Sequence, residues 1–393
     1  MTVFAQSAPA AFAPDVRASS ANIAVPWHLW AVAFASTSVM IGVIWDISWH
    51  RTIGRDTFWT PAHLAIYLGG TVAGLACGWL VLRTTFAGSV KEKAAGVTFW
   101  GFRGPLGAWV CIWGSLAMIT SAPLDDWWHN AYGLDVQILS PPHAVLAAGI
   151  LSIQIGAMLI ALAQQNTAGE KSRTRQLLFL YSGGVFTVML ATLGTEEIAF
   201  ANSHHGNIFF VATALMFPPV LVAISRSAIG PWGATTAAAV YMGATMLMIW
   251  ILQLFPAQPM LAPILRQVDQ MVPPPFPLLL VVAGVGVDLV LRHLPDHAGR
   301  PRQWTTAVVA GLAGMAAFGL AQWLFAEFLL SPGARNFFFA ADQWDYNTVP
   351  GNWQYEFRAS PLTGAGLVLA AVVAAATSLG GLGWGNWMSR VRR

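Results

Sequence analysis

The sequence predicts an all-α integral membrane protein with about ten transmembrane helices, arranged as outward-facing helical hairpins with both termini in the cytoplasm. The chain of 393 residues is 56% hydrophobic and only 9% charged, whereas soluble domains are about a quarter charged. Apolar runs of roughly 20 residues, the length that spans a hydrocarbon core, recur throughout. The 19 tryptophans agree, since tryptophan gathers at membrane interfaces. The lipid bilayer is therefore the first expected partner.

The predicted helices follow a tail over residues 1–26. This tail is rich in Ala, Ser and Pro and has no basic stretch before an apolar core, so we expect a flexible cytoplasmic segment and not a cleaved signal peptide. Residues 27–165 form one membrane region, and residues 176–393 add further transmembrane helices whose role the sequence does not indicate. The ten predicted spans are 27–48, 61–83, 104–124, 142–165, 176–195, 207–225, 233–254, 275–292, 305–329 and 362–383.

The basic residues orient these spans. Most of the 20 Lys and Arg residues fall in alternate loops, such as the segment 83–103, and at the C-terminus. The positive-inside rule assigns these loops to the cytoplasm, which predicts a multi-pass protein of a bacterial-type inner membrane. The opposite, extracytoplasmic face then carries most of the acidic side chains and several histidines, a composition that suits cations.

Two stretches of the first membrane region share the pattern D-x-x-W-H-x-x-x-G-x-D-x(3,4)-[ST]-P-x-H. They cover residues 46–63 and 125–143, and together they contain four of the nine histidines. Because the glycine, the tryptophan, the proline and the second aspartate also recur in register, the pattern predicts an internal repeat. We expect residues 27–165 to be two metal-binding helical hairpins.

The spacing of the first copy predicts how its ligands converge. Asp46 and His50 are four residues apart, so they share one face of a helix. Gly54 permits a tight turn, and Pro61 is typical of the first turn of the next helix. His63 lies in that turn, so the facing helix supplies a second imidazole to the same site.

The second copy repeats this arrangement with Asp125, His129 and His143. Two imidazoles and one carboxylate leave coordination positions open, which suits redox or Lewis-acid chemistry better than a closed structural site. On these grounds copper, non-haem iron and zinc are all candidates. Helix capping, or polar residues at a membrane edge, is the competing interpretation, but it accounts poorly for a pattern that recurs in register.

Four neighbouring residues are candidates for supporting roles. Asp56 and Asp135 hold matching positions and could each hold the ring N–H of a ligand histidine; a solvated turn residue is the alternative. Trp49 and Trp128 precede the first histidine of each copy, where they could shelter the metal or pack in the interfacial belt.

A third outward loop holds two carboxylates and two imidazoles within ten residues. This group is a candidate third cation site. Its residue order differs from that of the repeat, so a solvated loop is an equal alternative. The four residues are Glu196, Glu197, His204 and His205.

The stretch 46–63 resembles the metal-binding segment of the C subunit of the copper membrane monooxygenases, the family of particulate methane and ammonia monooxygenases. That segment has a D-x-x-W-H phrase followed by R-D-T and then F-T-P-x-H, and this chain has the first phrase from Asp46 to His50 and the rest up to His63. The resemblance assigns copper to Asp46, His50 and His63.

The family's second site is matched in spacing by Asp125, His129 and His143, with aspartate where the family has asparagine or a similar residue. The chain departs from the C subunit in having more predicted spans after residue 175, where no likeness is recognised. It also has no soluble cupredoxin-like domain.

Two functional hypotheses follow. The first is a copper-dependent membrane monooxygenase, or its catalytic subunit, in which Asp46, His50 and His63 hold the catalytic metal and dioxygen oxidises a small apolar substrate or ammonia. It implies partner subunits or an oligomer, and an electron donor. The alternative is non-enzymatic copper handling on the outer face, as a sensor, store, transporter or assembly protein, and a structural subunit that has kept its metals ranks third. The sequence shows no nucleotide-binding or nucleic-acid motif, so nucleic acid is not an expected partner.

Overall fold

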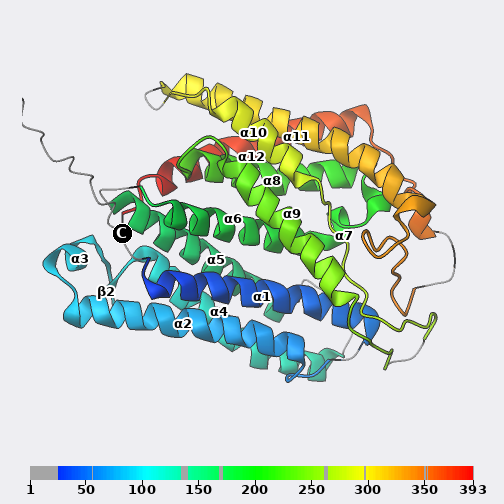
Figure 1. Ribbon diagram of the computed structural model, residues 1–393, viewed down its shortest axis with the longest axis horizontal. Helices are drawn as coiled ribbons and strands as arrows, with labels where there is room; N and C mark the ends of the chain where they lie inside the picture. The colour runs from blue at the N-terminus through cyan, green and yellow to red at the C-terminus, as the bar shows by residue number, and fades with distance from the viewer. Residues whose placement is uncertain are drawn as a thin grey trace, which may run out of the picture.

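The computed structural model describes residues 25–392, apart from 55, 134–139, 168–170, 261–263, 296–297, 349–350 and 352. These residues form a bundle of α-helices (Figure 1), and nine of the helices are long and apolar enough to cross a membrane. The all-α prediction is therefore confirmed at this level. The nine are α1 (Trp27–Thr52), α2 (Pro61–Ala87), α4 (Leu106–Tyr132), α5 (Pro141–Thr167), α6 (Arg173–Leu193), α8 (Asn207–Ser227), α9 (Gly233–Leu252), α11 (Arg300–Leu330) and α12 (Gly364–Met388).

Proline sets the start of several of these helices. Pro26 and Pro105 immediately precede α1 and α4, while Pro61 and Pro141 are the first residues of α2 and α5. Proline suits the first turn because its missing N–H would have no partner there and its φ angle is already helical. The starts of these four helices were accordingly predicted from the sequence to within a few residues.

The eighth predicted span, 275–292, is a short helix in the structure. Helix α10 covers only Leu280–Leu291, 12 residues, which is too short to cross a bilayer as a helix. Four prolines in the segment 273–277 explain the late start, because proline lacks the N–H that a helix interior requires. The apolar character that predicted a span is shared between this extended segment and α10.

The helices lie in adjacent groups (Figure 1). One group contains α1, α2, α4 and α5, with α1 packed on α2 and α4 packed on α5. Helices α6 and α9 lie between it and a second group formed by α8, α10, α11 and α12. The start of α1 and the C-terminus lie at the same end of the bundle, where Asn166 Nδ2 at the end of α5 donates to Val391 O at 2.8 Å.

The connection from α2 to α4 contains elements that the sequence did not predict. Helix α3 (Val90–Ala95) begins with a capping box between Ser89 and Glu92. Strands β1 (Val97–Phe99) and β2 (Phe102–Gly104) then form an antiparallel hairpin. Trp100 and Gly101 make its turn with positive φ angles of 47° and 83°. The remaining short elements are α7 (Thr195–Ile198) and the 3₁₀ turns Ala201–Ser203, Pro332–Ala334 and Trp353–Tyr355.

Glycine allows α4 and α5 to approach closely between Gly107 and Gly114 on α4 and between Gly149 and Gly156 on α5. A Cβ on Gly114 would lie 2.7 Å from Gly149 O, and one on Gly149 would lie 2.8 Å from Gly114 O. A Cβ on Gly156 would lie 2.6 Å from Gly107 O. Small residues at such contacts are the usual means by which membrane helices associate. This packing fixes the positions of Asp125 and His129 on α4 relative to His143 on α5.

We expect Gly156→Val to destabilise the protein by about 1–3 kcal/mol, since overpacking a tight contact costs about that much. Thermal melting of the full chain in detergent is the measurement. The matched control is Gly78→Val on α2, because a Cβ on Gly78 would meet nothing within 4 Å. Equal melting temperatures for the two variants would contradict the proposed role of the α4–α5 contact.

Candidate metal centre

The first cluster forms where α1 ends and α2 begins. Asp46 and His50 lie on the last turns of α1, and His63 lies in the first turn of α2, as the spacing predicted. His50 Nε2 is 3.9 Å from Asp46 Oδ2, and His63 Nε2 is 3.2 Å from Asp46 Oδ1. Each carboxylate oxygen of Asp46 therefore faces a different histidine.

Backbone carbonyls fix the orientation of both imidazoles. His50 Nδ1 lies 3.2 Å from Gly54 O, and His63 Nδ1 lies 2.9 Å from Thr57 O. A carbonyl can only accept, so each Nδ1 must carry the proton. In the neutral ring Nε2 is then an acceptor, and it points at the carboxylates. Gly54 makes this turn possible with a φ of +95°, which favours glycine.

The second cluster has the same local geometry at the junction of α4 and α5. His129 Nε2 is 3.5 Å from Asp125 Oδ2, and His143 Nε2 is 3.3 Å from Asp125 Oδ1. His129 Nδ1 lies 3.4 Å from Gly133 O, and Gly133 has a φ of +103°. The three predicted ligands are thus brought together here as well.

When the imidazoles are neutral, each cluster brings only acceptor atoms together; when they are protonated, Nε2–H donates to the facing carboxylate. Asp46 Oδ1 and Asp125 Oδ1 are buried, and they lie 3.2 and 3.3 Å from His63 Nε2 and His143 Nε2. A carboxylate oxygen next to the lone pair of a neutral imidazole is repulsive, so a proton or a metal cation is needed between them. Nitrogen and oxygen ligands bind a metal such as zinc at about 2.0–2.2 Å, which at tetrahedral angles separates them by about 3.3–3.6 Å. Most of the observed separations, 3.2, 3.3 and 3.5 Å, lie in or next to this range.

Asp56 lies in the first cluster itself. Its Oδ2 is 3.5 Å from His50 Nε2 and 3.2 Å from His63 Nε2. We expected it to support a ligand histidine through the opposite ring nitrogen, but backbone carbonyls take that role, so Asp56 is a further candidate ligand. Burial by itself raises the pKa of the Asp56 carboxyl, but the two facing imidazoles hold it well below its usual value.

Both clusters open into one cavity of about 430 Å³. Its polar wall holds Asp46, Asp56 and Asp125 together with the four histidines of the two clusters. The remaining wall is largely apolar and comes from α1, α5 and α6; it includes Val43, Ile47, Leu146, Ile150, Leu151 and Met189. Metal ions held in the two clusters would face the same enclosed space.

Segments from the C-terminal half cover the first cluster. Arg51, next to His50, forms an ion pair with Asp345 and donates from Nη1 to Pro273 O at 2.6 Å. Tyr346 N donates to Arg51 O at 3.2 Å, and Asp345 and Tyr346 both line the cavity. The cover therefore depends on connections that follow α9 and α11, far from the motif in sequence.

The remaining predicted site residues lie less centrally. Trp49 packs against the core, and Trp128 lies in a tilted arrangement beside Tyr132 with ring centroids 4.4 Å apart; neither is among the described residues that line the cavity. Asp135 lies outside the described residues. Sequence reasoning missed Arg51, Asp345 and Tyr346, because the signal for them is a contact between distant segments.

The third predicted group does not gather into one cluster. Glu196 and Glu197 are exposed. His204 is fully buried, donates from Nε2 to Ile198 O at 2.9 Å and accepts at Nδ1 from Gln322 at 3.1 Å. His205 is stacked between Trp323 and Phe357, at 3.6 and 3.7 Å, and donates to Trp323 O. Both histidines therefore connect the segment before α8 to α11, and His205 also contacts Phe357 in the connection before α12.

Burial lowers the pKa of His204 to about 3. The ring is therefore neutral at physiological pH, which agrees with one ring nitrogen donating and the other accepting. Among the described residues, the groups of Asp and His that lie close enough to share a cation are the clusters around Asp46 and Asp125.

Comparison with protein families, with curated proteins and with solved structures finds no match for this chain.

We expect Asp56→Asn to lower the metal affinity of the first cluster about tenfold or more, the usual effect of losing a carboxylate at a metal site, and to leave the second cluster unchanged. Chelator-competition titration of the purified protein measures both affinities. Asp126→Asn is the matched control, because Asp126 adjoins the second cluster but its Oδ2 accepts from Asn130 Nδ2 at 3.4 Å and it does not line the cavity. Wild-type affinity in the Asp56 variant would contradict its place in the cluster.

Proposed function

We propose that this chain is a copper-binding membrane protein with two Asp/His/His sites, and that it acts as a membrane monooxygenase or as its catalytic subunit. The observation that carries the proposal is the single cavity of about 430 Å³ onto which both clusters open. A store or a sensor needs ligands, but it does not need two open sites facing a common, largely apolar space. A reaction on a small apolar substrate needs both an open coordination position on the metal and an apolar space that faces it.

The donor sets fit copper. Imidazole nitrogen binds copper, zinc and iron well, and two imidazoles with a carboxylate leave positions open for a further ligand. When bound, copper supplies the one-electron chemistry that dioxygen reduction requires. The resemblance of residues 46–63 to the C subunit of copper membrane monooxygenases supports copper over zinc and iron.

The chain's own residues orient and enclose the site. The carbonyls of Gly54, Thr57 and Gly133 hold the rings of His50, His63 and His129 with Nε2 turned toward the carboxylates. Asp46, Asp56 and Asp125 balance the charge of a cation. The apolar wall that includes Ile47, Ile150 and Leu151 suits a small apolar substrate, which would partition into the bilayer, while ammonia would enter from the polar rim.

The proposed reaction also requires a partner. Hydroxylation inserts one oxygen atom of dioxygen into the substrate and releases the other as water, which consumes two electrons and two protons. An external reductant must supply the electrons, and we propose an electron-donating partner or subunit for this role. The extracytoplasmic face of a bacterial-type inner membrane is the location that the distribution of basic residues favours.

A second candidate function is copper handling without catalysis. The side chain of His50 is 43% exposed, and both clusters lie at helix ends, where ions can exchange with solvent. Sensing, storage or delivery would use the same ligands but would not require the apolar part of the cavity.

We expect His50→Ala and His129→Ala each to remove about one equivalent of bound copper, since each deletes a ligand of a different cluster. Elemental analysis of the purified full chain after copper loading is the measurement. His293→Ala is the control, because His293 lies at the other end of the bundle, after α10. If both cluster variants bind as much copper as the control, the metal sites and both candidate functions are wrong.

We expect copper-loaded, reduced protein to take up dioxygen faster when a short alkane or ammonia is supplied, and Asp46→Ala to abolish this increase. An oxygen electrode and product analysis give the rate and the coupling. If the wild-type protein binds two equivalents of copper but consumes no more oxygen than Asp46→Ala, the monooxygenase is contradicted and copper handling is favoured.

A further inference from the structure

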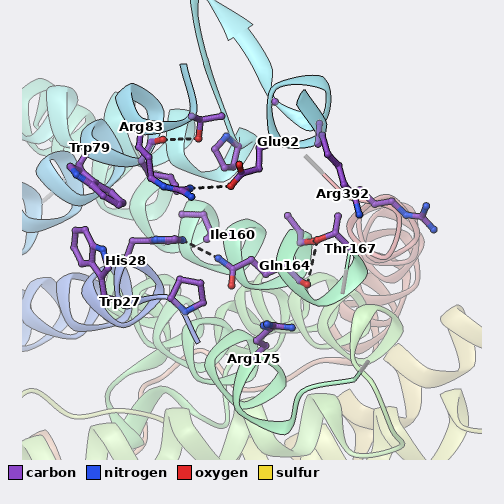
Figure 2. Close-up of a pocket in the computed structure, with 18 residues that line it drawn as sticks. Trp27, His28, Trp79, Arg83, Glu92, Ile160, Gln164, Thr167, Arg175 and Arg392 are labelled. Carbon is purple, nitrogen blue, oxygen red and sulfur yellow. Dashed lines mark hydrogen bonds and ion pairs between the residues drawn. The ribbon is translucent and has the colours of Figure 1, made fainter. Parts of the chain in front are cut away.

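A second cavity, of about 630 Å³, lies at the opposite end of the same four helices. It is bounded by the starts of α1 and α4 and by the ends of α2 and α5. His28 lines this cavity and His50 lines the metal centre, 22 residues apart on α1; at 1.5 Å per residue the two cavities are roughly 30 Å apart. Figure 2 shows the side chains that surround the second cavity.

The charge of this cavity is strongly positive. Four cations line it, Arg83, Lys91, Arg175 and Arg392, against one carboxylate, that of Glu92. Arg83 Nη1 pairs with Glu92 Oε1 at 3.0 Å (Figure 2). This pair balances one positive charge, and the lining as a whole keeps a net excess of three.

Arg175 is the most informative residue of the cavity. It is only 5% exposed, and its Nε and Nη1 atoms are buried with no hydrogen-bond partner among the described residues. Guanidinium donors that are removed from water and left unpaired are costly. An anion in the cavity would satisfy them with the paired geometry that arginine offers to phosphate.

Helix ends and tryptophans add two further indications. Helix α6 begins at Arg173, and α1 and α4 begin at the cavity, so three helix N-termini bring partial positive charge to this end of the bundle. Trp27 and Trp79 lie at the cavity with ring centroids 5.0 Å apart and are 53% and 44% exposed. Exposed tryptophan pairs of this kind are typical of the headgroup level of a membrane.

We propose that this cavity binds a phosphate group, supplied by the headgroup of an anionic phospholipid. Basic cavities between transmembrane helices, on the side rich in Lys and Arg, suit such headgroups, and the volume is within the range of small-ligand sites. Arg175 holds the phosphate from within the bundle, Lys91 and Arg392 approach it from the surface, and the two tryptophans lie where the glycerol and the first acyl carbons leave the cavity.

The test is native mass spectrometry of the full chain, titrated in detergent with phosphatidylglycerol or with phosphatidylcholine. We expect one saturable phosphatidylglycerol site, with affinity at least about tenfold above that for phosphatidylcholine. Arg175→Gln should weaken it about tenfold, the effect of losing a charge-assisted hydrogen bond. Lys91→Gln, at an exposed position, should weaken it several-fold even if the Arg175 variant folds poorly.

Arg302→Gln is the matched control, an exposed arginine near the start of α11 that does not line the cavity. A parallel calorimetric titration with inorganic phosphate distinguishes a lipid headgroup from a soluble phosphate as the source of the bound phosphate group. Binding of phosphate that Arg175→Gln removes, without a preference for phosphatidylglycerol, supports the site but assigns it to a soluble phosphate. Phosphatidylglycerol binding that is equal in the wild type, both cavity variants and the control overturns the proposal, as does failure of both ligands to bind.

Discussion

The hydrogen bonds from histidine Nδ1 to backbone carbonyls decide which chemistry the candidate metal centre can support. Gly54 O and Thr57 O hold the rings of His50 and His63, and Gly133 O holds that of His129. These carbonyls belong to the turns that end α1 and α4 and lead into α2. The same backbone that terminates a helix therefore sets the tautomer of its histidine and turns Nε2 toward an aspartate. With Nδ1 bonded to a carbonyl, each ring needs either a second proton on Nε2 or a cation between Nε2 and the facing carboxylate.

Charge is confined to the ends of the helices, and the two ends differ in sign. Cavities form at both ends of the first helix group, one lined by carboxylates and histidines and the other by arginine and lysine. Between them, α4 and α5 are held together by glycine contacts and apolar side chains. This separation follows from the cost of charge inside a bilayer. It leaves each end free to bind an ion of opposite sign without any charged group in the middle of the bundle.

Local features could be predicted from the sequence, and long-range ones could not. The length of the apolar runs and the prolines at their starts located the long helices. The spacing of Asp46, His50 and His63 correctly predicted that these side chains lie together, because residues four apart on a helix and across a short turn are brought close by local structure alone. Asp56 faces Nε2 of His50 and His63 because backbone carbonyls bond to the Nδ1 atoms of these rings. The ion pair of Arg51 with Asp345 joins residues 294 apart, and no local pattern indicates such a contact.

The cover over the first cluster has a consequence for how the protein is made. Asp46, His50, Asp56 and His63 are synthesised before the helices from α4 to α11, whereas Asp345 and Tyr346, which line the same cavity and contact Arg51, are synthesised after them. During insertion of the intervening helices the cluster is assembled but uncovered. Solvent can therefore reach its side chains more freely in this interval than after Asp345 has paired with Arg51. The order of synthesis thus leaves the carboxylates and imidazoles of the first cluster open to solvent before the fold is complete.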